Sequence, residues 1–122
     1  MLSTIAYGLA VVLSLFCVFI GARFLFAPQA SAAGYGVPAK DGDSAYLTIK
    51  GVRDLSYGLL GLALIAFTSA DAVAWYMLVV ALCPLADTVI VLRHGGTKAV
   101  AFGVHFATAV VVLLNAVLLF AL

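Results

Sequence analysis

Three side chains in this sequence are of the types that move protons within apolar surroundings: Asp54, Asp87 and His105. Each lies in or at the edge of a long apolar segment, where ionisable groups are costly and usually face a partner, a cavity or a ligand. Carboxylates and an imidazole within hydrogen-bond reach of a substrate are the groups that general acid–base catalysis uses. We therefore take Asp54, Asp87 and His105 as candidate catalytic residues.

Cationic side chains gather near the same residues. Four cations stand against two carboxylates in this region, whereas a purely structural network would tend towards neutrality, because unpaired buried charge is costly. A guanidinium group grips oxygen atoms in pairs, so the excess of cations favours an anionic or carbonyl-bearing guest. The candidate ligand-binding residues are Arg23, Lys50, Arg53, Tyr57 and Arg93.

The same residues also allow structural interpretations: long cations that snorkel to lipid headgroups, a closed ion-pair network, and a core histidine bonded to a backbone carbonyl. A working site predicts an open cavity bordered by His105, Arg53 and at least one of the two carboxylates. A structural network predicts direct bonds with no void. We further expect Arg53→Ala to abolish binding or destabilise the protein, and Lys50→Ala to leave both largely intact.

The elements that position these residues are membrane helices. Of the 122 residues, 66% are hydrophobic and 9% are charged, whereas a soluble domain carries about 25% charged residues. This composition predicts one all-α, integral membrane domain over residues 1–122. The net charge of +1, without a basic run, argues against nucleic-acid binding. The first apolar segment lacks a basic n-region and is longer than a signal-peptide core, so we expect a retained helix.

Four apolar segments predict a four-helix bundle with helices at about 2–26, 44–67, 72–93 and 98–122. Pro28 ends the first helix, and residues 28–43 are expected to form a connection in which Tyr35 is an interfacial anchor with its hydroxyl in water. The uncharged run after Asp54 is only about 16 residues, so the second helix must include Arg53 and Asp54 to span about 20. Pro84 predicts a kink one turn before Asp87.

Depth and helical phase place the polar residues together. At 1.5 Å per residue, Asp87 lies roughly 9 Å before the end of the third helix and His105 roughly 10 Å into the fourth. Residues at three- and four-residue spacing share a face, which predicts three polar faces: Lys50, Arg53, Asp54, Tyr57, Gly58 and Gly61; Cys83, Asp87 and His94; and Ala101, His105, Thr108 and Asn115. Gly58 and Gly61 favour close helix approach, and Asn115 an interhelical hydrogen bond.

Lys and Arg flank the first and third connections, whereas the second connection and both termini have none. The positive-inside rule then places both termini outside the cytoplasm in a multi-pass membrane protein. No histidine or cysteine pair has metal-ligand spacing and no glycine-rich phosphate loop is present, so we expect neither a metal nor a cofactor. The expected partners are the lipid bilayer and a small lipophilic ligand. A second copy of the chain, in a homo-oligomer, is a further candidate partner.

Short motifs occur in a specific order: GARFLFAP at 21–28, GYGVP at 34–38, KGVRD at 50–54, PLAD at 84–87 and LRHGG at 92–96. In these motifs the chain resembles a family of small integral membrane proteins of bacteria and fungi that is described only as a domain of unknown function. The resemblance implies a four-helix membrane fold, with a bacterial inner membrane as the expected location, and transfers no activity. The architecture is more loosely similar to that of DoxX-like proteins, some of which are associated with quinone-linked redox.

The predicted function is to bind a small lipophilic molecule in a net-positive pocket near the cytoplasmic leaflet. Such a pocket could also transform its ligand, as an acid–base isomerase, cyclase or hydrolase. The alternative is a non-catalytic quinone- or lipid-binding protein or accessory membrane subunit. A proton-coupled exporter is less favoured, because small transporters of that kind use a carboxylate in their first helix, and residues 2–26 contain none.

Overall fold

Helices form all the regular structure of the chain, and the computed structural model describes every residue from 1 to 122. The elements are α1 (Leu2–Phe26), α2 (Pro28–Tyr35), α3 (Ser44–Phe67), α4 (Ala70–Val80), α5 (Leu82–Arg93), α6 (Lys98–Val100), the π-helix η1 (Ala101–Phe106) and α7 (Ala107–Phe120). Three stretches are long and apolar enough to cross a membrane: Leu2–Phe26, Ala70–Arg93 and Lys98–Phe120. The protein is therefore an all-helical membrane protein.

The helix α3 differs from those three stretches. It has 24 residues, a length that suffices to cross a bilayer, but its first half carries Lys50, Arg53 and Asp54. The expected count of four helices is not confirmed, because the connection at 28–43 contains the additional helix α2. Pro28, which ends α1, is also the first residue of α2, a position where proline is favoured because its missing N–H would have no helical partner.

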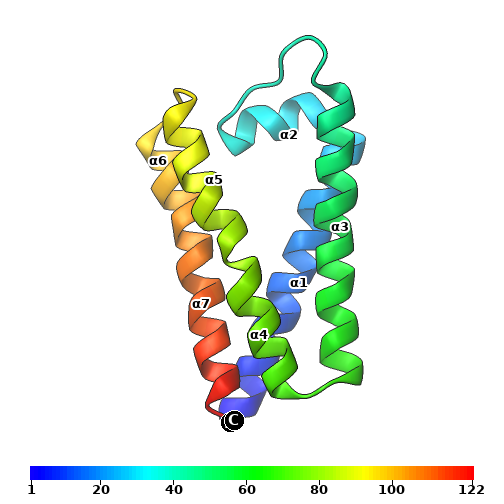
Figure 1. Ribbon diagram of the computed structural model, residues 1–122, viewed down its shortest axis with the longest axis vertical. Coiled ribbons are helices and arrows are strands. Elements are labelled where there is room, and N and C mark those ends of the chain that lie inside the picture. The colour runs from blue at the N-terminus through cyan, green and yellow to red at the C-terminus, as the bar shows by residue number, and fades with distance from the viewer.

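A sharp turn at Ala27 places α2 across one end of the molecule (Figure 1). The proline ring disfavours helical backbone angles at the preceding residue, and Ala27 adopts φ −140° and ψ 65°. The Ser31 hydroxyl donates a hydrogen bond of 2.9 Å to the carbonyl of Arg23, near the end of α1. This bond holds α2 back against the last turn of α1.

The other end of α2 is fixed by Gly36. Its φ of 101° ends the helix in the left-handed conformation, and the Val37 N–H closes the turn on the carbonyl of Ala32 at 3.2 Å. A Cβ at Gly36 would lie 2.9 Å from Val91 Cγ1 of α5. The end of α2 is thus pressed against α5, which fixes the position of Tyr35 just before the glycine.

Direct backbone contact joins α1 to α3. A Cβ at Gly21 would lie 2.3 Å from the backbone nitrogen of Leu55, and one at Gly58 would lie 2.6 Å from the carbonyl oxygen of Ser14. Only glycine allows this approach, which is the close packing expected for Gly58 and is common between membrane helices. We refer to this contact as the glycine seam.

The end of the molecule away from α2 is closed by small and aliphatic side chains. They come from α1, from α4 with Ala81 directly after it, and from α7, and they form one buried cluster: Ala6, Ala10, Val73, Ala74, Met77, Ala81, Val112, Ala116 and Leu119. Asn115 Nδ2 donates a 2.8 Å hydrogen bond to the carbonyl of Ala6, which is the interhelical bond expected for this asparagine. This closed end fixes α1, α4 and α7 relative to one another.

The two remaining long helical stretches are irregular. The stretch of α4 and α5 is interrupted near its middle, and the stretch of α6, η1 and α7 is irregular near its start. The stretch that starts at Ala70, two residues before the expected position, is interrupted at Ala81, close to the kink expected from Pro84, which has no N–H to give to the carbonyl of Val80. The last stretch contains η1, whose wider π-helical turn carries His105. Such turns often occur at functional sites.

Candidate functional site

A cavity of about 310 Å³ lies between the helices beside α2. Most of its lining is hydrophobic, and its polar lining comes from every long helical stretch and from α2: Ser14, Cys17, Arg23, Ser31, Tyr35, Asp54, Tyr57, Tyr76, Cys83, Asp87, His105 and Thr108. Five residues predicted from the sequence are therefore brought together, namely Arg23, Asp54, Tyr57, Asp87 and His105. The predicted residues Lys50, Arg53 and Arg93 are outside the lining.

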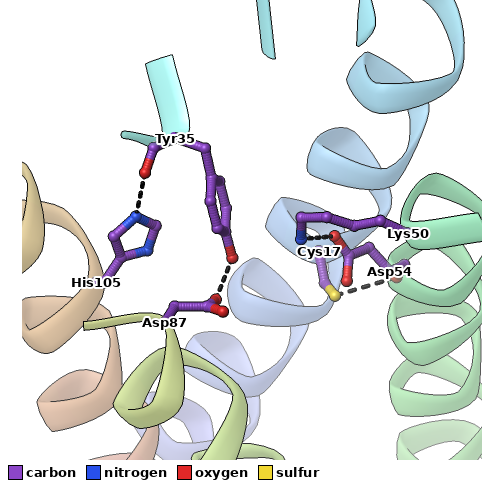
Figure 2. Close-up of polar contacts among 6 residues, drawn as sticks. All are labelled: Cys17, Tyr35, Lys50, Asp54, Asp87 and His105. Atoms are coloured by element: carbon purple, nitrogen blue, oxygen red, sulfur yellow. Dashed lines mark hydrogen bonds and ion pairs between the residues drawn. The ribbon is translucent and has the colours of Figure 1, made fainter. Parts of the chain in front are cut away.

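Tyr35 lies at the centre of this cluster, at the end of α2 (Figure 2). Its hydroxyl donates a hydrogen bond to Asp87 Oδ2 on α5. Its carbonyl accepts a 2.7 Å hydrogen bond from His105 Nε2 on η1, and the rings of Tyr35 and His105 lie with their centroids 4.2 Å apart. Burial raises the pKa of the Tyr35 hydroxyl, and the neighbouring Asp87 raises it further, so the phenol keeps its proton and acts as the donor.

On the side of the cavity away from His105, the Tyr35 ring contacts side chains of α1 and α3 (Figure 2). Lys50 Nζ lies 4.2 Å from the centroid of this ring and 4.7 Å from that of Phe24, distances at which a cation is attracted to an aromatic face. The rings of Phe24 and Tyr35 meet edge to face, with centroids 5.5 Å apart. Tyr35 therefore contacts α1, α3, α5 and η1 at once.

Tyr35 was expected to point its hydroxyl to water, and the structure instead turns it inward to Asp87. Sequence reasoning therefore missed the residue that joins the site. The available signal was the motif GYGVP, in which a glycine that ends a helix directly follows the tyrosine.

Asp54 forms the one salt bridge of the structure. Its Oδ2 accepts a 2.7 Å hydrogen bond from Lys50 Nζ, one turn earlier on α3, and the side chains of Lys50 and Asp54 are 30% and 19% exposed. The thiol of Cys17 on α1 donates to the backbone carbonyl of Asp54 at 3.1 Å. Lys50 thus neutralises one carboxylate of the cavity and contacts Tyr35. Its ammonium group therefore points to protein groups, whereas snorkelling would direct it to lipid headgroups.

Arg53 does not border the cavity, contrary to the expectation from helical phase. Its residue is exposed, whereas Lys50, Asp54 and Tyr57 face the cavity or its rim. The reason is the glycine seam: Gly51 and Gly58 face α1, which turns the far edge of the polar stripe, where Arg53 lies, away from the cavity.

Arg93 and His94 also lie away from the cavity. Both are exposed at the end of α5, and His94 Nδ1 lies 2.8 Å from the carbonyl oxygen of Ile90 in its own helix. The face expected to join Cys83, Asp87 and His94 therefore includes only the first two, because the cavity ends before the last turn of α5. The charged groups at the cavity are two cations, Arg23 and Lys50, and two carboxylates, so the predicted excess of positive charge is not found there.

The remaining groups define what the cavity can do chemically. His105 is 3% exposed and its Nε2 is occupied by the carbonyl of Tyr35, so it bonds a backbone carbonyl and neither carboxylate. Asp87 accepts a hydrogen bond from Tyr35 but has no cation partner. A carboxylate next to a phenol inside a cavity can accept or return a proton. No three His, Cys, Asp or Glu side chains are grouped so that they could hold a metal ion.

Comparisons with known proteins identify the family. Neither a search of curated proteins nor a search of solved structures found a match. One family model matches residues 14–119. This range includes every motif from GARFLFAP to LRHGG and every residue that lines the cavity except the apolar Leu13. The chain belongs to this family, which is described as a domain of unknown function (DUF4267).

Proposed function

We propose that the protein crosses the membrane four times, through α1, α3, the stretch α4–α5 and the stretch α6–α7. The length of α3 and its seam with α1 support the fourth crossing, because a helix packed along a spanning helix lies at the same depth. The basic residues around the first and third connections support a cytoplasmic location for α2 and both termini on the opposite side of a bacterial inner membrane. The cavity then lies in the cytoplasmic leaflet.

We propose that the cavity binds a small lipophilic molecule. The observation that carries this proposal is a void of about 310 Å³ among Tyr35, Asp54, Asp87 and His105, where a closed network would leave none. Ligand sites are typically cavities of about 300–1,000 Å³, largely apolar, with a few convergent polar groups. The lining fits this description.

A carbonyl-bearing ligand fits the cavity better than an anion. Arg53 and Arg93 lie away from the cavity, and Lys50 is already paired with Asp54. Arg23 lines the cavity and has no ion-pair partner, so its guanidinium is free to donate to a ligand oxygen. Arg23 and the unpaired carboxylate of Asp87 both line the cavity. One unpaired cation together with one unpaired carboxylate favours a neutral ligand whose oxygen accepts hydrogen bonds.

The pair formed by Asp87 and Tyr35 supports acid–base chemistry as a second function of the cavity. In a ligand with a carbon–carbon double bond β,γ to its carbonyl, Asp87 can take a proton from the α carbon while Arg23 stabilises the oxyanion of the dienolate. Returning that proton to the γ carbon moves the double bond into conjugation with the carbonyl and completes an isomerisation. Tyr35 sets the position of the carboxylate by its hydrogen bond. The alternative is a non-catalytic quinone- or lipid-binding protein or accessory subunit, in which the same groups only recognise the ligand.

Native mass spectrometry of the protein released from membranes in mild detergent tests binding. We expect a co-purified small molecule on the wild type, and its loss from Asp87→Asn, which keeps the shape of the side chain and removes the charge. Asp71→Asn is the matched control, because Asp71 is exposed and outside the cavity. Equal occupancy of the two variants, or no adduct on the wild type, would contradict the proposal. Incubating the released compound with fresh protein distinguishes an isomerase, which changes its structure, from a binding protein.

A further inference from the structure

A shallow groove on the surface of the molecule adjoins the cavity. It lies between α1 and the stretch from η1 to α7, and its lining is Leu13, Phe16, Gly103, Val104, Ala107, Thr108 and Val111. Four of these residues, Leu13, Phe16, Val104 and Thr108, also line the cavity. The cavity and the groove are therefore adjacent and share part of their lining, with the polar groups on the cavity side.

The chemistry of the groove is that of a hydrocarbon binding site. Phe16 and Val104 are both 45% exposed and none of its residues is charged. The Thr108 hydroxyl donates to the carbonyl of Val104 in its own helix at 2.6 Å, so it leaves no free donor in the groove. An acyl chain needs no hydrogen-bond partner, whereas a carbonyl or other acceptor there would find no free side-chain donor.

The direction of the groove matches that of a lipid tail. From His105, which bonds Tyr35 at the polar part of the cavity, the groove follows residues 107 and 111 along α7, and on α1 it runs back from Phe16 to Leu13. Both paths lead away from α2. From residue 104 to residue 111 the helix rises about 10 Å, and this path points towards the middle of the bilayer if α2 lies at its surface.

We propose that the ligand is a single-chain amphiphile whose carbonyl head occupies the cavity and whose hydrocarbon tail leaves through the groove into the bilayer. This inference rests on the proposed binding function and adds the class of the ligand. The cavity alone is at the lower limit of the usual range of ligand-site volumes, so a long chain must continue into the groove. Entry from the lipid phase follows from the same geometry.

Two photoreactive ketones test the head and the tail separately, with the protein in phosphatidylcholine nanodiscs. The short probe is methyl propyl ketone bearing a diazirine, and the long probe is methyl pentadecyl ketone with the diazirine midway along its chain. We expect the short probe to label the cavity around Cys83 and Asp87. We expect the long probe to label the groove at Ala107 and Val111, which line the groove but not the cavity, and excess unlabelled methyl pentadecyl ketone to suppress that labelling.

A matched pair of glycine variants separates the groove from the rest of the surface. A Cβ at Gly103 or at Gly8 would meet nothing within 4 Å, so both Gly103→Leu and Gly8→Leu should fold, but only Gly103 lines the groove. We expect Gly103→Leu to lose groove labelling by the long probe and to keep cavity labelling by the short probe. Gly8→Leu should behave as the wild type with both.

Each result decides between the two proposals. Cavity labelling by the short probe with long-probe labelling spread over the lipid-facing surface would overturn the amphiphile and leave the binding function standing. No cavity labelling by the short probe would overturn both. Groove labelling that excess ketone does not suppress, but that changes with the acyl chains of the host phospholipid, would assign the groove to bilayer lipid and also overturn the inference.

Discussion

The two walls of the cavity are built in different ways. On one side, α1 and α3 touch backbone to backbone through the glycine seam, and their polar groups close on each other in the salt bridge between Lys50 and Asp54. On the other side, α5 and η1 are irregular helices, one with a proline and one with a π-helical turn, and their polar groups Asp87 and His105 bond α2 through Tyr35.

Under the proposed binding function, this difference makes α1 and α3 mainly a support for the cavity and gives α5 and η1 the groups that position the ligand. The seam leaves no space for a guest and no room for adjustment, so we regard α1 and α3 as the fixed wall. The irregular wall presents an unpaired carboxylate to the cavity and depends on a single residue, Tyr35, to hold its groups in place. Substitutions at the glycine seam should therefore change stability. Substitutions that disturb the polar groups of the irregular wall should change binding, as should the loss of Arg23, the cation of α1 that lines the cavity.

The largest expected effect is on the seam. Gly58→Ala would place a Cβ 2.6 Å from the carbonyl oxygen of Ser14 and from the backbone nitrogen of Val18. Because backbone atoms cannot rotate away, α1 and α3 must separate, and we expect a loss of about 2–3 kcal/mol in the free energy of unfolding. Circular dichroism during titration with sodium dodecyl sulfate measures this loss.

Gly103→Ala is the control for the seam on the opposite wall. No atom lies within 4 Å of the added methyl group, so the unfolding free energy should stay within about 1 kcal/mol of the wild type. Similar losses for Gly58→Ala and Gly103→Ala would show that the two walls do not differ.

A smaller effect is expected from the cations of α3. Lys50→Met leaves Asp54 without its partner and removes the cation between the rings of Phe24 and Tyr35. We expect it to cost about 1–2 kcal/mol, between the values for exposed and for buried pairs. Arg53→Met should cost less than about 0.5 kcal/mol, as for other exposed sites. This order is the reverse of the sequence-based expectation, and the same titration would contradict it if Arg53→Met were the more harmful.

Among the residues that contact one another at the cavity, the smallest change in stability is expected at the irregular wall. Tyr35→Phe keeps the ring beside His105 and removes only the hydroxyl that bonds Asp87. The loss should be about 1 kcal/mol, the usual net value of one hydrogen bond, but ligand occupancy in native mass spectra should fall because the carboxylate loses its orientation. Tyr46→Phe is the control, since Tyr46 is 74% exposed. Unchanged occupancy in Tyr35→Phe would mean that Tyr35 does not position the site.

The fold was partly predictable because its signals are local. Helix bounds for α1 and α3 coincide with the expected ranges, since apolar runs and Pro28 mark them directly. The helix α2 was missed because prolines and glycines at 28–42 were interpreted only as breakers. Its interior is rich in alanine, the strongest helix former, and Pro28 and Gly36 are suited to begin and end a helix.

The site was less predictable because the direction of its side chains depends on how pairs of helices pack against each other. Helical phase grouped Lys50 with Arg53, but only the seam between α3 and α1 decides which edge of that face meets the cavity. A tyrosine is equally suited to an interface or to a buried hydrogen bond, so the inward direction of Tyr35 could not follow from its residue type. Asp87 and His105 were found because an ionisable group in an apolar helix is informative by itself.

The central claim is that the space between the two walls is a binding site and not a closed polar network. The most direct test is an experimental structure of the protein purified from membranes in a mild detergent without added ligand. We predict elongated density in the cavity, with its polar end near Asp87 and Arg23 and its tail towards Phe16. Direct bonds of Asp87 with Lys50 or His105, with the void filled by side chains, would contradict the claim.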